Sequence, residues 1–476
     1  MRDTAMETSP LDACDTGLPV SGRAAWTGEA RQLLRLALPL AATQLSQMII
    51  LATDTVMLGH FSTDALAAAA LGNTVFVLAW LIGSGPPMAV SAMIAHILGE
   101  DPGNVAGVRS VTRMGLWSVA ILSVPLLVYL LATRMMLLGF GEDPMLAAGA
   151  ARFMSTLCVG LPFALGFQVL RSFSTALSRP LAPMVVMGLM ILFNALMDYA
   201  LIFGHFGLPQ LGLLGSGMAS ASSNVFGFCA LLAIILTAPA LKRYRILLRF
   251  WRPDSATLGE LFRLGVPIGL TMVFEVMLFA GAALMMGRFG TATLAAHQIA
   301  LTIPSLTFMV PLGIGMASTV RVGLAAGAGD RVAARRAGFI AIGMGAVFMT
   351  ATAAVLLLFP RAIVTLWLAD NPANAAAIAL AVGFLHVAAG FQIADGIQGV
   401  ASQALRGLKD ARAPMWIAVA SYWLVGFPLC LALGYGAGLK GIGIWLGLAF
   451  GLFVAAAALT WRFAWLSKIP RQQNQA

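Results

Sequence analysis

Long apolar runs without a charged residue constrain the fold of this chain more than any other feature. Four such runs, at 114–133, 338–360, 413–439 and 441–461, contain no Asp, Glu, Lys or Arg. A helix that crosses a bilayer takes about 20 apolar residues, whereas a strand of a membrane barrel takes about 10. Because 60% of the residues are hydrophobic and only 10% are charged, the chain also lacks the polar surface of a soluble protein. The sequence therefore predicts an all-α membrane protein.

Loop signals between the apolar runs divide the chain into twelve predicted transmembrane helices, six in each half. The predicted spans are 36–58, 70–97, 112–133, 150–170, 181–204, 213–237, 264–287, 297–320, 337–359, 376–405, 414–434 and 441–462. When Lys and Arg are assigned to alternating loops, 24 of the 29 fall on the side that holds both termini. Loops rich in Lys and Arg remain in the cytoplasm, so we expect both termini there.

An internal repeat relates the two halves. Residues 33–70 and 261–298 align without gaps at a separation of 228 positions. The identical pairs are Leu33/Leu261, Arg35/Arg263, Leu36/Leu264, Pro39/Pro267, Met57/Met285, Gly59/Gly287, Phe61/Phe289, Leu66/Leu294 and Ala67/Ala295. Because each half has an even number of spans, both halves enter the membrane from the same side. The sequence therefore predicts two six-helix lobes related by a pseudo-two-fold axis along the membrane normal, with a cavity between them.

These lobes define the expected domains. They are a cytoplasmic tail at 1–32, a first lobe at 33–240, a cytoplasmic linker at 241–260, a second lobe at 261–465 and a cytoplasmic tail at 466–476. The most basic stretch, 242–252, lies in the linker. It is either an amphipathic segment on anionic lipid or a topology signal that joins the lobes, and we favour the second interpretation.

Four of the nineteen acidic residues lie inside predicted spans: Asp54, Asp198, Glu275 and Asp395. None of these spans has a basic residue near its centre. An unpaired carboxylate in a bilayer is costly, so such groups are usually protonated, bind a cation or line water. The structural alternative is a neutral acid that is hydrogen-bonded to a neighbouring helix.

A cation site is predicted in the first half. Asn194 and Asp198 are four residues apart, so they share one face of a helix, and both can face Asp54. Two carboxylates and an amide oxygen suit Na+ or a proton, because hard cations prefer oxygen ligands. The hydroxyl of Ser220 could complete this site. We expect no other metal ion.

A second polar cluster is predicted in the other half. Gln392, Asp395 and Gln398 form a polar stripe at i, i+3 and i+6 on an apolar helix, and Glu275 is their counterpart across that half. In the repeat, Glu275 aligns with Gln47, whereas Asp54 aligns with Ala282. The two halves thus carry their acids at different places. We expect Gln47 and the second cluster to line the substrate cavity.

Other functional classes lack support. The cysteines are widely scattered, which argues against a disulfide or a metal site; they are Cys14, Cys158, Cys229 and Cys430. Neither a nucleotide-binding loop nor a nucleophile elbow is visible, so we expect no cofactor, no ATP-driven pumping and no enzyme activity. The net charge of +10 follows from the basic loops, so no nucleic-acid partner is expected.

Twelve spans in two parallel repeats, with acids in the first, fifth, seventh and tenth, resemble the multidrug and toxic compound extrusion family and specifically its bacterial NorM-like branch. The resemblance covers the chain after about residue 30. Its most specific motifs are Thr53-Asp-Thr-Val-Met-Leu-Gly, Asn194 with Asp198, Pro267 with Glu275, Asp395-Gly-Ile-Gln, and Ala404-Leu-Arg-Gly-Leu-Lys-Asp before Pro414.

The resemblance implies an antiporter of the bacterial inner membrane, expected to be a monomer. It would export small organic compounds, often cationic, in exchange for Na+ or H+, by rocking between outward-open and inward-open states. Carried over residue by residue, the cation site of the first lobe falls on Asp54, Asn194, Asp198 and Ser220, and the acids of the second lobe fall on Glu275 and Asp395. The family commonly has Thr where this chain has Ser220.

Two alternatives remain open. A flippase for lipid-linked oligosaccharides, from the same superfamily, would line its cavity with Arg and Lys, and no predicted span carries either residue at its centre. An intramembrane enzyme acting on prenyl diphosphates would show Asp-rich magnesium motifs, and none is visible.

Overall fold

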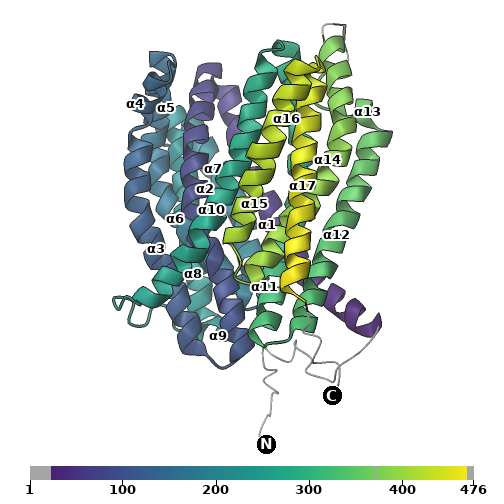
Figure 1. Ribbon diagram of the computed structural model, residues 1–476. Helices are drawn as coiled ribbons and strands as arrows, with labels where there is room; N and C mark the ends of the chain where they lie inside the picture. Colours follow the sequence, from purple (N-terminus) through teal and green to yellow (C-terminus); the bar gives the residue numbers. More distant parts are fainter. Residues whose placement is uncertain (1–22, 370, 373, 469–476) are drawn as a thin grey trace, which may run out of the picture.

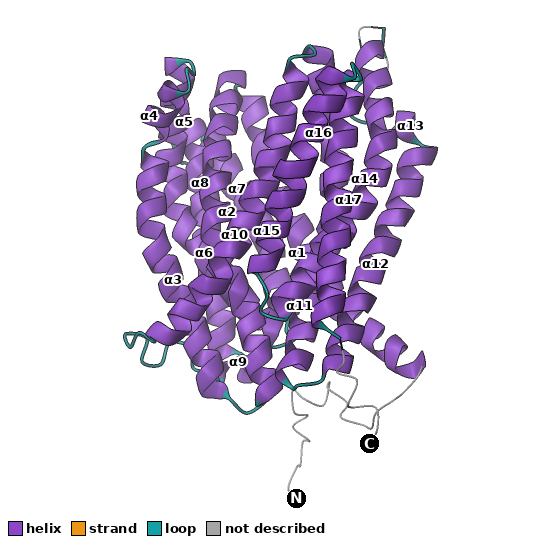
Figure 2. Ribbon diagram, in the orientation of Figure 1, coloured by secondary structure: helices purple, strands orange, loops and turns teal. Residues whose placement is uncertain are grey.

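The computed structural model describes residues 23–369, 371–372 and 374–468, which fold into α-helices joined by short turns (Figures 1 and 2). Twelve helical segments are long and apolar enough to cross a membrane. No strand occurs in the described ranges. The prediction of an all-α membrane protein with twelve spans is confirmed.

The first lobe contains six spanning segments, of which the fourth runs through α5, η1 and α6. Its helices are α1 (Arg23–Phe61), α2 (Thr63–Glu100), α3 (Val105–Leu131), α4 (Thr133–Gly139), α5 (Pro144–Leu157), η1 (Cys158–Gly160), α6 (Leu161–Ala176), α7 (Leu181–Phe203), α8 (Leu213–Thr237) and α9 (Pro239–Lys242).

The second lobe also contains six spanning segments. The eleventh span of the chain, which belongs to this lobe, is built from α15, η2, α16 and η3, and η2 and η3 are π-helical. Its helices are α10 (Ser255–Gly287), α11 (Thr291–Gly327), α12 (Arg331–Leu358), α13 (Pro360–Val364), α14 (Ala375–Gly407), α15 (Arg412–Val419), η2 (Ala420–Gly426), α16 (Phe427–Leu431), η3 (Ala432–Gly436) and α17 (Lys440–Leu466). Figure 1 shows the two lobes side by side, with the start of α1 and the end of α17 on one side of the bundle. We call this the terminal side and the opposite one the far side.

Short polar side chains begin several of these helices. Asn104 accepts a hydrogen bond from the Gly107 N–H at 2.8 Å, and Asp330 accepts one from the Ala333 N–H at 2.8 Å. These side chains replace the missing backbone partners in the first turn of a helix. The tight turns keep consecutive helices antiparallel and adjacent.

Apolar side chains fill three buried clusters. One lies mainly in the first lobe around residues such as Leu165 and Phe173 and extends to Ile268 of α10, and another lies within the second lobe around Phe384 and Trp445. The third cluster packs α1, through residues such as Leu40, onto α11, α12, α14 and α17 of the second lobe. The terminal-side half of α1 therefore belongs to the contact between the lobes.

Two pairs of glycines bring the lobes into backbone contact on the terminal side. A Cβ atom at Gly99 of α2 would collide with the Leu324 carbonyl oxygen of α11, and one at Gly327 of α11 would collide with the His96 carbonyl oxygen of α2. Gly99 and Gly327 are 228 positions apart, which is the separation of the sequence repeat. The pseudo-two-fold axis therefore passes between these two helix ends.

The second glycine pair lies further along the same helices. Gly85 of α2 packs against the backbone of Gly265 in α10, and Gly313 of α11 packs against the backbone of Ala41 in α1. Gly85 and Gly313 are again 228 positions apart. We call the four glycines Gly85, Gly99, Gly313 and Gly327 the glycine seam.

An ion pair joins the lobes beside the glycine seam. Arg321 of α11 donates from Nε and Nη2 to the two carboxylate oxygens of Glu29 in α1, at 2.7 and 2.6 Å. The Glu29 carboxylate is 7% exposed. A two-point arginine–carboxylate contact fixes both position and angle, so it orients α1 against α11.

The linker between the lobes packs on α3. Arg109 and Trp117 of α3 donate to the carbonyl oxygens of Tyr244 and Phe250 at 2.7 and 2.9 Å. At the end of the linker, hydrogen bonds from Thr257 and Ser110 hold the pKa of Asp254 below its usual value. The linker backbone is therefore fixed to the first lobe.

Candidate cation and substrate sites

The predicted first-lobe site is assembled from α1, α7 and α8. The Ser220 hydroxyl donates to Asp54 Oδ2 at 2.8 Å. Asn194 and Asp198, one turn apart on α7, are fully buried and lie next to Asp54. The structure thus brings together the four residues that the sequence predicted for this site.

Several polar atoms of this cluster have no hydrogen-bond partner. They are Asp54 Oδ1, both carboxylate oxygens of Asp198, and the amide oxygen and nitrogen of Asn194. Buried polar atoms nearly always have partners, so an unsatisfied group of oxygens needs a proton or a cation to complete it. Within the described residues, no group of three or more His, Cys, Asp and Glu could hold a metal ion. The donor set of two carboxylates, an amide and a hydroxyl fits Na+ or H+.

The predicted second-lobe cluster is assembled from α10 and α14. The Gln398 amide donates to Glu275 Oε1 and to Asp395 Oδ1, both at 3.2 Å. Asp395 and Gln398 are 6% and 4% exposed. One amide therefore bridges the buried Asp395 and the half-buried Glu275, which come from different helices, and this bridge links their charge states.

Two further groups surround these acids. Tyr422, in the π-helical η2, is buried and close enough to interact electrostatically with both carboxylates. Arg406 is buried near Glu275, and its Nη1 donates to Gln403 Oε1 at 3.2 Å. Neither residue was among the predicted site residues, because a tyrosine and a helix-end arginine give no distinctive spacing.

The structure separates the residues of the predicted stripe on α14. Gln392 does not join Asp395 and Gln398; its amide nitrogen donates to Thr352 of α12 at 2.9 Å, and its oxygen accepts from Thr307 of α11 at 3.4 Å. Three residues of an α-helix turn through about 300°, which is about 60° short of a full turn. Side chains at i and i+6 therefore point about 120° apart. Gln47 is partly buried on α1 and makes no hydrogen bond to either acidic cluster.

A buried arginine in the first lobe was missed. Arg171 lies inside α6, five residues before the helix ends, and is 2% exposed. Its guanidinium donates to Gln44 at 2.7 Å and to Gln168 at 2.5 Å, and its Nε has no partner. The predicted fourth span ended at residue 170, which wrongly placed this cation in a loop.

Comparisons with known proteins identify relatives of this chain. The sequence model of the family MatE matches residues 39–200 and 267–432. The chain is 43% identical over 439 residues to a protein of Brucella suis biovar 1 (strain 1330) named "Probable multidrug resistance protein NorM", covering 92% of this chain and 93% of that protein. A protein of the same name from Pseudomonas putida is 43% identical over 443 residues, covering 93% and 96%.

Solved structures share the fold. A crystal structure of "MATE in complex with MaL6" superimposes with a TM-score of 0.83 at 19% identity, covering 93% of this chain and 98% of that one. The structure described as "Outward-facing conformation of a multidrug resistance MATE family transporter of the MOP superfamily" gives 0.83 at 20% identity, covering 93% and 97%.

Proposed function

The chain belongs to the MatE family, and on this premise we propose that it is a membrane antiporter that exports small organic compounds, many of them cationic, in exchange for Na+ or H+. The names of its relatives support multidrug efflux. We further propose that it works as a monomer in the bacterial inner membrane and needs no cofactor.

The observation that carries this proposal is the pair of separate acidic clusters. Within the described residues, none of the four intramembrane acids forms an ion pair with Lys or Arg. A carboxylate buried in this way is stabilised when it takes up a cation, and it becomes costly again when the cation leaves. Cation uptake and release can therefore drive a change between two arrangements of the lobes.

The two clusters supply different chemistry. The first, with Asp54, Asn194, Asp198 and Ser220, offers a compact set of oxygens for the coupling ion. The second offers Glu275 and Asp395, joined by Gln398, for a cation or a cationic compound. In this arrangement the glycine seam closes the terminal side. Export then requires the seam to open for loading and to close for release.

We expect dye transport by the purified protein in liposomes to depend on an imposed Na+ or pH gradient. The assay uses a fluorescent organic cation and vesicles in which each gradient is set separately. Because the exchange is an antiport, an ion gradient directed against the dye flux should accelerate it, and reversing that gradient should slow it.

The control is Asp64→Asn, which removes an exposed acid at the start of α2 outside both clusters. It should transport dye like the parent protein. Dye flux that is indifferent to both gradients would contradict coupling while leaving export itself in place. No dye flux under any gradient would contradict the multidrug assignment.

The basic loops predict the orientation of the chain. With Cys-free protein in intact cells, a cysteine at Leu247 in the linker should not react with a membrane-impermeant maleimide, because the linker faces the cytoplasm. A cysteine at Met145, which is 85% exposed at the far-side start of α5, should react. The opposite labelling pattern would invert the topology.

Arg171 and Arg406 favour a second candidate, a flippase for a lipid-linked pyrophosphate. Both guanidiniums are buried, and their hydrogen-bond partners are uncharged glutamines. A pyrophosphate would supply a negatively charged partner for Arg171, whose hydrogen-bond partners are neutral, and a second one for Arg406, which already lies near Glu275. The same liposomes can test this: accelerated flipping of a fluorescent lipid pyrophosphate, with no dye flux, would favour the flippase.

A further inference from the structure

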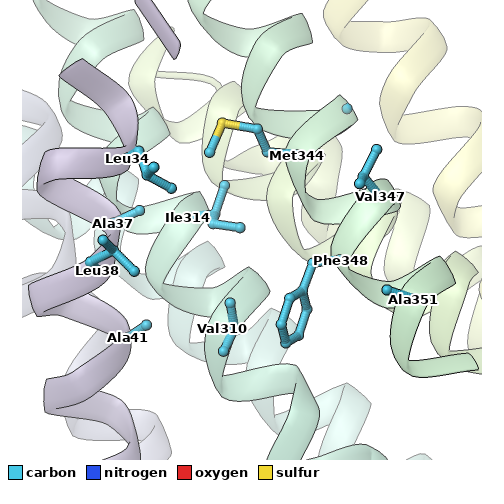
Figure 3. Close-up of a pocket in the computed structure, with 11 residues that line it drawn as sticks. Leu34, Ala37, Leu38, Ala41, Val310, Ile314, Met344, Val347, Phe348 and Ala351 are labelled. Atoms are coloured by element: carbon cyan, nitrogen blue, oxygen red, sulfur yellow. The ribbon is translucent and has the colours of Figure 1, made fainter. Parts of the chain in front are cut away.

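A groove lies between the lobes (Figure 3), and its lining includes no residue of either acidic cluster. Its volume is ≈ 710 Å³, which is within the range of small-molecule sites. Every lining side chain is apolar or glycine; the residues are Leu34, Ala37, Leu38 and Ala41 of α1, Val310 and Ile314 of α11, and Gly343, Met344, Val347, Phe348 and Ala351 of α12. The first lobe thus supplies one wall and the second lobe supplies the others.

The groove opens toward the hydrocarbon of the bilayer. Leu38 and Val347 on its two walls are 61% and 72% exposed, although both lie within membrane-spanning segments. With no polar side chain on its lining, the groove offers little to a hydrated or charged ligand. A flexible apolar chain from the surrounding lipid is the occupant that this lining suits.

Two arginines lie on the terminal side of the groove, one on each wall. Arg31 of α1 is exposed and precedes Leu34 and Leu38 by three and seven residues, so the three side chains share a helix face. Arg336 of α12 precedes Gly343 and Val347 by seven and eleven residues, which again places them on one face. The Nε of Arg336 is buried and has no hydrogen-bond partner.

We propose that this groove binds a phospholipid of the leaflet on the terminal side, with one acyl chain between α1 and α12 and its phosphate held by Arg31 and Arg336. Arginine presents paired donors that match phosphate oxygens, and an anionic headgroup adds attraction to both cations. Because the walls come from different lobes, the lipid fits one relative placement of the lobes and favours that placement when bound.

The proposal is tested by native mass spectrometry of the full-length protein in detergent, titrated with phosphatidylglycerol or with phosphatidylcholine of the same acyl chains. We expect one phosphatidylglycerol to bind more tightly than phosphatidylcholine. Arg31→Gln and Arg336→Gln should each weaken phosphatidylglycerol binding about fivefold, as expected for one basic residue at a lipid surface. Arg134→Gln, at the far-side helix α4, is the matched charge control and should bind like the parent.

Filling the groove tests the acyl-chain site. A Cβ at Gly343 would meet no atom within 4 Å, so Gly343→Leu fills the groove without disturbing its packing. We expect this variant to lose the bound lipid, and Ala351→Phe to do the same. Gly188→Leu, at another open glycine position on α7, is the matched control. Melting temperatures in detergent show which variants are folded, and the pair of groove variants guards against failure of one of them.

The outcomes are distinct. Unchanged binding in folded Gly343→Leu and Ala351→Phe would overturn the groove as the site. Equal binding of both lipids, unaffected by the arginine substitutions, would overturn phosphate recognition. Displacement of the lipid by a transported dye, with no effect of the arginine variants, would assign the groove to substrate entry and overturn the proposal. None of these results depends on the coupling ion.

Discussion

Asp395→Asn is expected to reduce drug transport to the level of liposomes without protein. Asparagine keeps the size of the side chain and can still contact the bridging amide of Gln398, which lies 3.2 Å from Asp395 Oδ1. It cannot take up a proton or balance a bound cation, so the change in charge that drives the cycle is lost. Removing a buried charge also removes a desolvation cost, so expression and melting temperature should not fall.

The measurement is gradient-driven dye flux in liposomes, with protein amount and melting temperature determined in the same preparations. Asp64→Asn carries the same chemical change at an exposed position and serves as the matched control. Gln398→Ala separates bridging from charge, because it removes the amide that joins Glu275 and Asp395 but keeps both acids. It should retain transport with an altered dependence on pH. Undiminished flux by Asp395→Asn would remove this acid from the mechanism.

The number of spans could be predicted from the sequence because the bilayer sets their length and excludes charge from them. The repeat added more, since its register of 228 positions also relates Gly85 to Gly313 and Gly99 to Gly327. The first-lobe cluster could be predicted because Asn194 and Asp198 are one turn apart and no basic side chain competes for them. These features depend on local spacing, which a single sequence shows directly.

The burial of Arg171 inside a span could not be predicted, and the reason lies in the local sequence. α6 continues past Arg171 to Ala176, and Ser178, two residues further on, adopts a left-handed conformation with φ of 55°. The Arg179 N–H then bonds to the Ser174 carbonyl at 2.9 Å and closes the helix end. Glycine usually occupies such a position, so a serine there gives no sign of where the helix stops. Hydropathy alone ends the span at its first charge.

Gln392 shows the limit of reading one helix by itself. Spacings of three residues place neighbours on one face, but the face rotates by about 60° with each step. The helices on either side then decide the contact, and here α12 and α11 present Thr352 and Thr307 to Gln392. Such partners are distant in the sequence, so only the packed structure identifies them.

Gly99→Leu and Gly327→Leu are expected to prevent closure of the terminal side and to abolish export. A Cβ at Gly99 would meet the Leu324 carbonyl of the opposite lobe, and a Cβ at Gly327 would meet the His96 carbonyl. A backbone atom cannot move aside as a flexible side chain can. Overpacking of this kind costs about 1–3 kcal/mol for each inserted side chain, so the ratio of the closed to the open arrangement should fall about fivefold to 150-fold in each variant. The pseudo-symmetry predicts that the two substitutions have equal effects.

Closure can be measured independently of transport with cysteines in place of Glu29 and Arg321, which form the ion pair beside the glycine seam. A short bifunctional maleimide should cross-link these cysteines efficiently in the parent protein and poorly in either leucine variant. Gly259→Leu, near the start of α10 where a Cβ meets no atom within 4 Å, is the matched control and should cross-link normally. If a leucine at 327 leaves cross-linking and dye flux unchanged, the two helix ends do not have to approach each other during the cycle, and the lobes must then close through the contacts of Gly85 and Gly313 alone.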